Sequence, residues 1–124
     1  MLFFSTDFDN NHHRLAIWQA DEGAQIPEPE KQVGTEHVAY ELAAFAELQE
    51  AYRTFKKHWV KIHHTAFHGI TKSICFFDPD GNLLEVNCNV PPEEYNKSMP
   101  NLFSSYHSFE EEMQAPQKPG TVAP

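Results

Sequence analysis

Residues 36–58 place a strand pattern directly before a helix pattern, and this order constrains the fold more than any other feature of the chain. In residues 36–42 (EHVAYEL) the side chains alternate, so that His37 faces one way and Val38 faces the other. In residues 43–58 the apolar residues recur at steps of three and four, which predicts one stripe of a helix. The stripe consists of Phe45, Leu48, Tyr52 and Phe55.

Two further strand patterns and a tight turn follow the helix pattern. Residues 73–77 (SICFF) and 83–88 (LLEVNC) predict strands, and DPDGN at 78–82 between them is a strong turn signal. Residues 59–62 (WVKI) are a candidate strand, whereas HHTAFHGITK at 63–72 is interpreted as loop-like. The order strand, helix, strand, strand, turn, strand predicts an α+β fold.

The segments on either side carry weaker patterns. Residues 2–5 (LFFS) and 13–19 (HRLAIWQ) predict two strands joined by a polar turn. A spacer with Pro, Glu and Gly follows and predicts an exposed connection. Later in the chain, short helices are candidates at 93–98 (EEYNKS) and 109–114 (FEEEMQ), and the Pro- and Gly-rich stretch at 114–124 predicts a mobile tail.

The chain is strongly acidic. Its 124 residues carry a formal net charge of -9, and the pI is near 5.2. Because this charge repels phosphate backbones and anionic lipid, we expect neither nucleic acid nor a membrane as a partner. No apolar run approaches the roughly 20 residues needed to cross a bilayer. The short MLFF start is followed by acidic residues rather than by a secretory apolar region, so we expect a cytoplasmic protein.

The cysteine and histidine contents point to different chemistry. Cys75 and Cys88 lie in apolar strand patterns without a C-x-x-C motif, which predicts buried, reduced thiols. Histidine is abundant, and imidazole is both a common metal ligand and a proton shuttle near neutral pH. The eight histidines stand at positions 12, 13, 37, 58, 63, 64, 68 and 107.

His37 and Glu85 are the residues whose positions favour a metal site. Each lies on an alternating strand, and in a βαβββ unit the first and last strands can lie side by side. If both side chains face one concave surface, an imidazole and a carboxylate come within reach of one ion of Fe(II), Mn(II), Zn(II) or Ni(II). For either residue alone the structural alternative is favoured: a half-buried strand histidine and a solvated rim glutamate.

Four segments resemble, in the right order, consecutive signatures of extradiol ring-cleaving dioxygenases of the vicinal oxygen chelate superfamily. They are NNHHRLAI at 10–17, EHVAYEL at 36–42, HGITKS at 68–73 and FFDPDGNLLEV at 76–86. DPDGN alone is common, but the ordered set is fairly specific to the superfamily, and HHR with HG-x-T-x-S points to the ring-cleaving branch. The resemblance spans residues 1 to about 90 and implies paired βαβββ modules whose sheets curl around a metal.

The resemblance also implies a domain organisation. Residues 1–20 correspond to the last two strands of a first module, and residues 21–35 to a linker. Residues 36–90 form a complete module, and residues 91–124 are a C-terminal extension that is partly disordered. The expected architecture is a glyoxalase-type βαβββ module with part of a second module, in a mixed, curled sheet.

Individual residues receive roles from the same resemblance. His37 matches the metal ligand on the first strand of the module, and Glu85 matches the carboxylate ligand on its last strand. His13 matches the histidine that serves as catalytic acid and base, and His12 is its neighbour at the substrate. His68 matches a histidine near the substrate hydroxyl or the distal pocket wall.

Each of these roles has a structural alternative. His12 and His13 are also typical of a polar hairpin end, and His68 of a loop beside glycine. Phe76 is a candidate for lining an apolar substrate pocket, with ordinary core packing as its alternative. The remaining histidines have no matched role and are interpreted as surface residues. They are His58, His63, His64 and His107.

Two features depart from the family's pattern. The ring-cleaving branch usually has a tyrosine where this chain has Cys75, and a thiol is a weaker hydrogen-bond donor that is readily oxidised. The first module should begin with its own strand and another histidine ligand, whereas this chain starts near the third strand. Three explanations stay open: a fragment, a non-catalytic truncation, or two chains that pair so that His37 and Glu85 of both build a four-ligand site.

Three functions follow from these alternatives. The leading hypothesis is an extradiol-type dioxygenase, complete or incomplete, which acts on a catecholic aromatic with O2 and Fe(II), with Mn(II), Ni(II) or Zn(II) as other metals. The second is a metal-dependent glyoxalase-like isomerase or lyase with a dimeric site. The third is a non-catalytic module that binds an aromatic ligand. An exposed sheet edge and an apolar face lead us to expect a homodimer.

Overall fold

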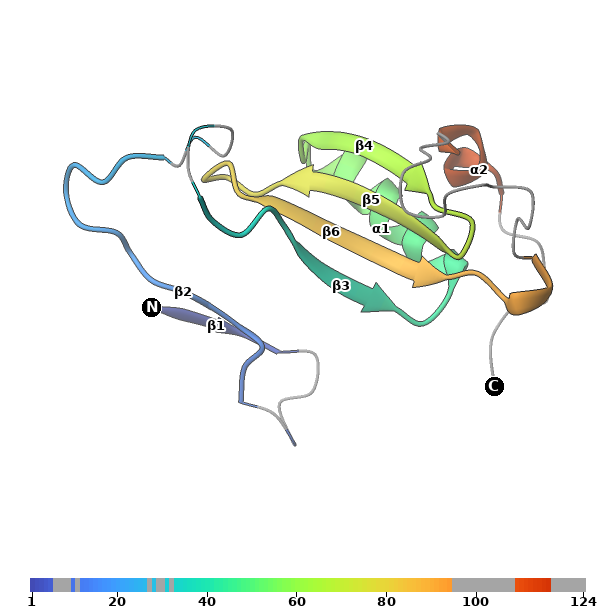
Figure 1. Cartoon of the computed structure of the whole chain (residues 1–124), viewed down its shortest axis with the longest axis horizontal. Helices are drawn as coiled ribbons and strands as arrows, with labels where there is room; N and C mark the ends of the chain where they lie inside the picture. Colours follow the sequence, from blue (N-terminus) through green and yellow to red (C-terminus); the bar gives the residue numbers. More distant parts are fainter. Residues whose placement is uncertain are drawn as a thin grey trace.

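The computed structural model describes residues 1–5, 10, 12–26, 28, 31, 33–94 and 109–116. A βαβββ unit occupies the middle of the chain (Figure 1) and consists of β3 (Val38–Leu42), α1 (Phe45–Lys57), β4 (Ile62–Phe67), β5 (Thr71–Phe77) and β6 (Leu83–Asn89). The flanking elements are β1 (Leu2–Phe4), β2 (Leu15–Ile17), a single 3-10 turn η2 (Pro92–Glu94) and α2 (Glu110–Gln114). None of the helices described is long and apolar enough to cross a membrane.

The four long strands form one mixed sheet in the order β3-β6-β5-β4. Strand β3 runs parallel to β6, and β5 is antiparallel to both of its neighbours. The first and last strands of the unit are therefore adjacent, because α1 carries the chain from one edge of the sheet across to the other. The prediction of an α+β fold with a βαβββ module in a mixed, curled sheet is confirmed.

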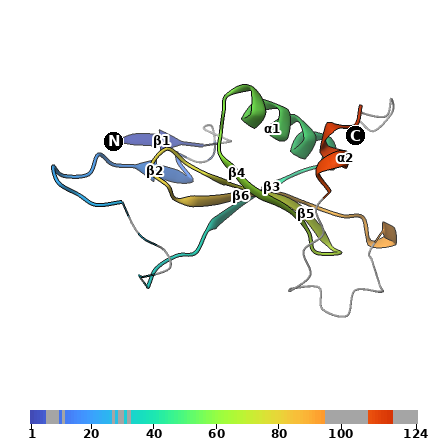
Figure 2. The same cartoon turned by 90° about the horizontal axis from the view of Figure 1, so that it is seen from above.

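Helices α1 and α2 lie on the same side of this sheet (Figure 2). The apolar stripe predicted for residues 43–58 points at the sheet, and Leu48 and Tyr52 on it are buried. Gln49 donates a hydrogen bond from Nε2 to the backbone oxygen of Glu112 at 2.7 Å, which ties α2 to α1. The buried residues of this core are Leu48, Tyr52, Ile74, Cys88, Phe109 and Met113.

The opposite face of the sheet carries the polar residues. We call it the site face and define it by the strand positions that point away from α1. Register assigns His37 and Ala39, Leu83, Glu85 and Asn87, Ser73, Cys75 and Phe77, and His64 and Ala66 to it. Its floor is made of small residues, since Ala66, Ser73 and Cys75 are buried.

One strand was missed by the sequence analysis. The loop-like interpretation of residues 63–72 was wrong, because β4 covers Ile62–Phe67 and pairs along its length with β5. The strand expected at 59–62 was also wrong: Trp59 is exposed with a φ of 58°, so the chain turns there. Histidines replace the apolar residues that usually reveal a strand, and a register shift in β4 breaks its alternation.

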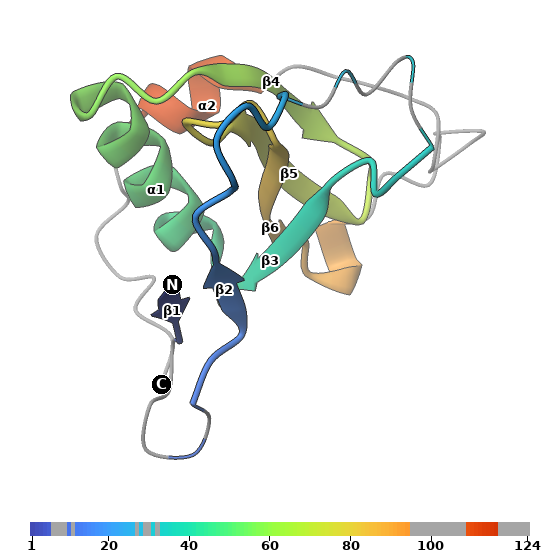
Figure 3. The ribbon, with the colours of Figure 1, turned by 90° about the vertical axis from the view of Figure 1, so that its left-hand side faces the viewer.

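The predicted N-terminal hairpin is present. Strands β1 and β2 pair antiparallel and form a sheet of their own, and their main contacts are with each other. In Figure 1 this hairpin lies at the lower left of the four-stranded sheet, and Figure 3 looks from that side, with the hairpin in front of the sheet. Its assignment to a first module stays a prediction, as do the linker at 21–35 and the other domain bounds.

One of the C-terminal predictions is confirmed. The helix expected at 109–114 is α2. The helix expected at 93–98 begins as the 3-10 turn η2, and its remaining residues lie outside the described part of the chain. Most of the tail predicted at 114–124 also lies outside it.

We predict that Leu48→Ala lowers the free energy of unfolding by about 2–5 kcal/mol, because it leaves a cavity between α1 and the sheet. Leu48 is 0% exposed at the centre of the core. Urea denaturation measures the change. Thr54→Ala on the exposed side of the same helix is the control and should be nearly neutral. Equal losses in both variants would contradict the packing described above.

Candidate metal centre

His37 and Glu85 lie side by side on the site face. His37 comes directly before β3, and Glu85 on β6 is the register partner of Ala39. His37 Nε2 is 3.4 Å from Glu85 Oε2. The Glu85 side chain is only 15% exposed, whereas the His37 side chain is 37% exposed at the rim. The proximity expected from the sequence is therefore present, and its use as a metal site stays a prediction.

Neighbouring polar groups orient both side chains. Glu36 Oε2 contacts His37 Nδ1, which leaves Nε2 as the nitrogen that points toward Glu85. Asn87 donates from Nδ2 to Glu85 Oε1 at 3.2 Å, and the Cys75 thiol donates to Glu85 Oε2 at 3.6 Å. Partners of this kind fix the tautomer and direction of groups that bind metals. The sequence analysis missed Glu36 and Asn87 in this role, although both adjoin or alternate with a predicted ligand.

Cys75 on β5 lies between Glu85 of β6 and His64 of β4 on the site face. The side chain is 4% exposed and free of disulfides, as the sequence predicted. Burial and the nearby Glu85 carboxylate raise the pKa of Cys75 from 9.0 to about 12, so it is a neutral donor at physiological pH. Burial on the other face also raises the pKa of Cys88 to about 11.

His64 is a site-face residue that the sequence analysis assigned to the surface. It pairs with Cys75, which in turn pairs with Glu85, so the three residues form one row across the sheet. Burial lowers the pKa of His64, and His63 lowers it further, while Glu85 opposes the shift. Recognising β4 as a strand would have placed His64 on this face. The residues after Ile62 pair with β5, which the sequence did predict.

The other predicted residues are not gathered at the pair. His68 follows β4 and donates its backbone N–H to Thr71 at 3.0 Å, in a turn where Gly69 has a φ of +85°. Strand alternation assigns it to the far end of the site face. His12 and His13 lie exposed on the hairpin segment, with their Nδ1 atoms 2.8 Å apart.

Phe76 lies on the face that α1 covers. Its ring packs against Phe55 with the ring centroids 4.4 Å apart. Since Phe76 is the neighbour of Cys75 along β5, alternation points the two side chains to opposite faces of the sheet. The structure therefore supports the core alternative for this residue and separates it from His37 and Glu85.

The pair offers two protein donors of a type that suits Fe(II). An imidazole nitrogen and a carboxylate oxygen belong to the donor set of non-haem iron, which in oxygen-using sites is two histidines and one carboxylate. Within the part of the chain that the structure describes, no group of three or more His, Cys, Asp or Glu side chains is arranged to hold a metal ion. The donor types fit, and a third donor is needed from elsewhere.

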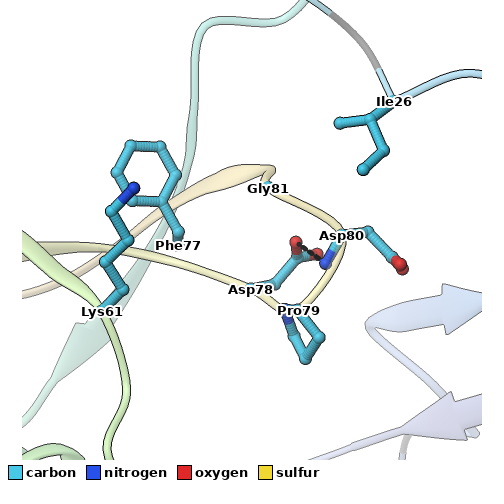
Figure 4. A pocket seen from close by; sticks show the side chains of 7 residues that line it. All are labelled: Ile26, Lys61, Phe77, Asp78, Pro79, Asp80 and Gly81. Carbon is cyan, nitrogen blue, oxygen red and sulfur yellow. Dashed lines mark hydrogen bonds between the residues drawn. The ribbon is translucent and has the colours of Figure 1, made fainter.

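A shallow pocket of about 340 Å³ lies at the turn between β5 and β6. Figure 4 shows Lys61 and Phe77 on one side of the turn and Ile26 on the other. The Asp78 carboxylate accepts backbone hydrogen bonds from Asp80 and Asn82 and closes the predicted DPDGN turn. The pocket is lined by Ile26, Lys61, Phe77, Asp78, Pro79, Asp80 and Gly81, and so excludes the His37–Glu85 pair.

We predict that the raised thiol pKa makes stability fall at alkaline pH. The folded state holds the Cys75 proton up to about pH 12, while an unfolded thiol releases it near pH 9.0. The contribution is therefore complete below pH 9 and is lost as the pH rises from about 9 toward about 12. Urea unfolding in reducing buffer should show a steeper fall for the wild type than for Cys75→Ser. Equal slopes would contradict a buried, neutral thiol. Cys88→Ser should also flatten the fall, but less, because the pKa of Cys88 rises only to about 11, and the exposed Thr54→Ala serves as the control that keeps both thiols.

The sequence of the chain matches known proteins over most of this unit. Residues 3–86 match the Glyoxalase/Bleomycin resistance protein/Dioxygenase superfamily. Biphenyl-2,3-diol 1,2-dioxygenase 2 of Rhodococcus globerulus is 32% identical over 89 residues, which are 69% of this chain and 46% of that protein. Biphenyl-2,3-diol 1,2-dioxygenase 3 of the same organism is 29% identical over 96 residues, which are 76% and 50% respectively.

A solved glyoxalase/dioxygenase from Nostoc punctiforme is 20% identical, with a TM-score of 0.48, over 57% of this chain and 50% of that one. The chain spans about half the length of the curated relatives it matches. The superfamily match covers more than half of the chain and includes both His37 and Glu85. The chain therefore belongs to the Glyoxalase/Bleomycin resistance protein/Dioxygenase superfamily.

Proposed function

We propose that this chain provides the metal-binding module of an extradiol-type dioxygenase, which opens a catecholic aromatic ring with O2 and Fe(II). The observation that carries the proposal is the 3.4 Å approach of His37 Nε2 to Glu85 Oε2. Membership of the superfamily and similarity to two biphenyl-2,3-diol dioxygenases support it. The catecholic substrate and the choice of iron over Mn(II), Ni(II) or Zn(II) belong to the proposal.

Fe(II), when bound, would supply the redox chemistry that lets O2 react with an aromatic ring. His37 Nε2 and Glu85 Oε2 would hold it, and one further histidine would complete a two-histidine, one-carboxylate set. That histidine would come from polypeptide beyond the described residues or from a second chain.

The residues around the pair would prepare it for this task. The contact of Glu36 with His37 Nδ1 would leave Nε2 as the ligand nitrogen, because a neutral imidazole has one donor and one acceptor nitrogen. Asn87 and Cys75 each hold one Glu85 oxygen. Cys75 stands where the extradiol dioxygenases that this chain resembles have a tyrosine, and because its one thiol proton is donated to Glu85, it would not replace that tyrosine as a donor to the substrate hydroxyl.

Proton transfer would fall to histidines outside the pair. We assign His13 as the acid and base, with His12 beside it at the substrate, and His68 as a donor near the substrate hydroxyl. His68 lies half-buried at the end of β4, while His12 and His13 lie on the exposed hairpin. The hairpin would therefore have to adjoin the site face in the active form.

A second candidate is a metal-dependent isomerase or lyase with a dimeric site. Two donors per chain favour it, since His37 and Glu85 from two chains would make four ligands around one ion. β3 is an edge strand of the described sheet, and edge strands are often covered by a partner. A homodimer is accordingly part of both proposals, and action in the cytoplasm stays a prediction from the sequence.

Iron binding tests the proposal directly. The full chain is prepared without oxygen, loaded with Fe(II), freed of excess metal and assayed for iron per chain. We expect about one iron per chain, or about half for a site shared across a dimer, by ligand counting. His37→Ala and Glu85→Ala should abolish it. The exposed residue His58 provides the control, because His58→Ala should retain the metal.

Catechol turnover then separates the two candidate enzymes. His13→Ala should keep its iron and lose ring cleavage, because it removes a proton carrier and no ligand. Full ring cleavage by this variant would remove His13 from the mechanism, whereas an iron-loaded wild type that cleaves no catechol would favour the isomerase or lyase. A folded wild type that retains no iron would overturn both proposals.

A further inference from the structure

Ser73 carries a hydroxyl that is buried in the site face. The residue lies on β5, two positions before Cys75, and it is 0% exposed. Within the part of the chain that the structure describes, Ser73 Oγ has no hydrogen-bond partner. A buried hydroxyl without a partner costs about 1–3 kcal/mol. An alanine would avoid that cost, as the buried Ala66 opposite Ser73 on β4 does, so packing alone does not explain the serine.

The burial of Ser73 limits what can use its hydroxyl. A side chain that is 0% exposed is out of reach of a molecule bound above the sheet, so the partner must be a neighbouring side chain. On β5 the next residues of the same face, Thr71 and Cys75, are about 6.8 Å away along the strand. On β4 the opposite residue is Ala66, which has no polar group.

Asn87 of β6 is the nearest polar neighbour. It lies directly opposite Ser73 in the antiparallel pairing of β5 with β6. Side chains in such pairs share one face of the sheet and have Cβ atoms about 4.5–5.5 Å apart. Rotation about side-chain bonds alone is therefore enough to bring the Ser73 hydroxyl and the Asn87 amide into hydrogen-bond range.

Asn87 also contacts the candidate metal ligand. Its Nδ2 donates to Glu85 Oε1 at 3.2 Å, which is the long end of the usual range. This bond uses the amide nitrogen and leaves Oδ1 as the acceptor atom of Asn87. A hydroxyl that donates to Oδ1 would polarise the amide and strengthen its bond to Glu85, because linked hydrogen bonds reinforce one another.

We propose that Ser73 is a positioning residue for the Glu85 ligand. When the His37–Glu85 pair holds a metal ion, the Ser73 hydroxyl donates to Asn87 Oδ1, and Asn87 Nδ2 holds Glu85 Oε1 so that Oε2 faces the ion. The bond between Ser73 and Asn87 forms by rotation of these two side chains, with no change in strand register. This role depends on the proposed metal centre and is independent of whether the chain opens aromatic rings.

Binding of Mn(II) to the full chain tests this role without any turnover. Equilibrium dialysis measures the affinity of the wild type and of each variant. Ser73→Ala should weaken binding roughly 10-fold, because outer partners of a metal ligand typically contribute about 10- to 100-fold in affinity. Thr71→Val is the matched control, since it removes a hydroxyl two residues away on the same strand, and it should bind like the wild type.

A double-mutant cycle tests whether Asn87 carries the effect. Asn87→Ala should weaken Mn(II) binding at least as much as Ser73→Ala, and the double variant should bind no more weakly than Asn87→Ala. Additive losses would overturn the inference, because Ser73 would then act by another route. NMR of the Asn87 side-chain amide gives a spectroscopic readout. Saturating Zn(II), which is diamagnetic, should shift its signal in the wild type and shift it less in Ser73→Ala.

Urea unfolding without metal separates positioning from a structural role. Ser73→Ala should be as stable as the wild type or more stable, because it removes a buried hydroxyl that has no partner. Unchanged Mn(II) affinity in this variant, whatever its stability, would overturn the inference and leave the metal centre intact. A wild type that binds no Mn(II) would overturn both. Binding that depends on Ser73, in a chain that cleaves no catechol, would support the inference and count against the dioxygenase.

Discussion

The parallel pairing of β3 with β6 is the constraint on which the rest of the site depends. These strands are the first and last of the βαβββ unit, and α1 makes their parallel alignment possible by crossing the sheet. Because side chains alternate along each strand, one register brings His37 and Glu85 to the same face. A shift of one residue would send Glu85 into the apolar core beneath α1. The buried contacts of Leu48 and Ile74 that seat the helix therefore also hold the register of the site.

One face of the sheet packs the core, and the other carries the candidate ligands. The face beneath α1 carries the large apolar side chains, and Phe109 and Met113 near α2 extend that core. The site face has a floor of small buried residues, among them Ser73 and Cys75. Polar groups on this face hold one another, as Cys75 and Asn87 do with Glu85. The candidate ligands thus lie on a sheet whose other face packs against α1.

The main features of the unit could be predicted from the sequence, because they have local signals. Alternation in β3 and the apolar stripe of α1 predicted both elements, and the turn at 78–82 located β5 and β6. The proximity of His37 and Glu85 followed from the strand order. Strand β4 could not be predicted in the same way, because histidines and a bulge break its pattern. The position of Phe76 and the partners of Glu85 depend on which face of the sheet α1 covers. Pairing between neighbouring strands determines that face, and the sequence of one strand alone does not reveal it.

A crystal structure of the full chain soaked with Mn(II) would test most directly whether His37 and Glu85 share one ion. Manganese scatters anomalously, so its position is found without assumptions about ligands. We predict an anomalous peak within coordination distance of both His37 Nε2 and Glu85 Oε2, completed by a histidine of a longer polypeptide or of a second chain. A well-ordered pair with no peak beside it, in crystals that bind Mn(II) elsewhere, would contradict a metal centre at the β3–β6 edge.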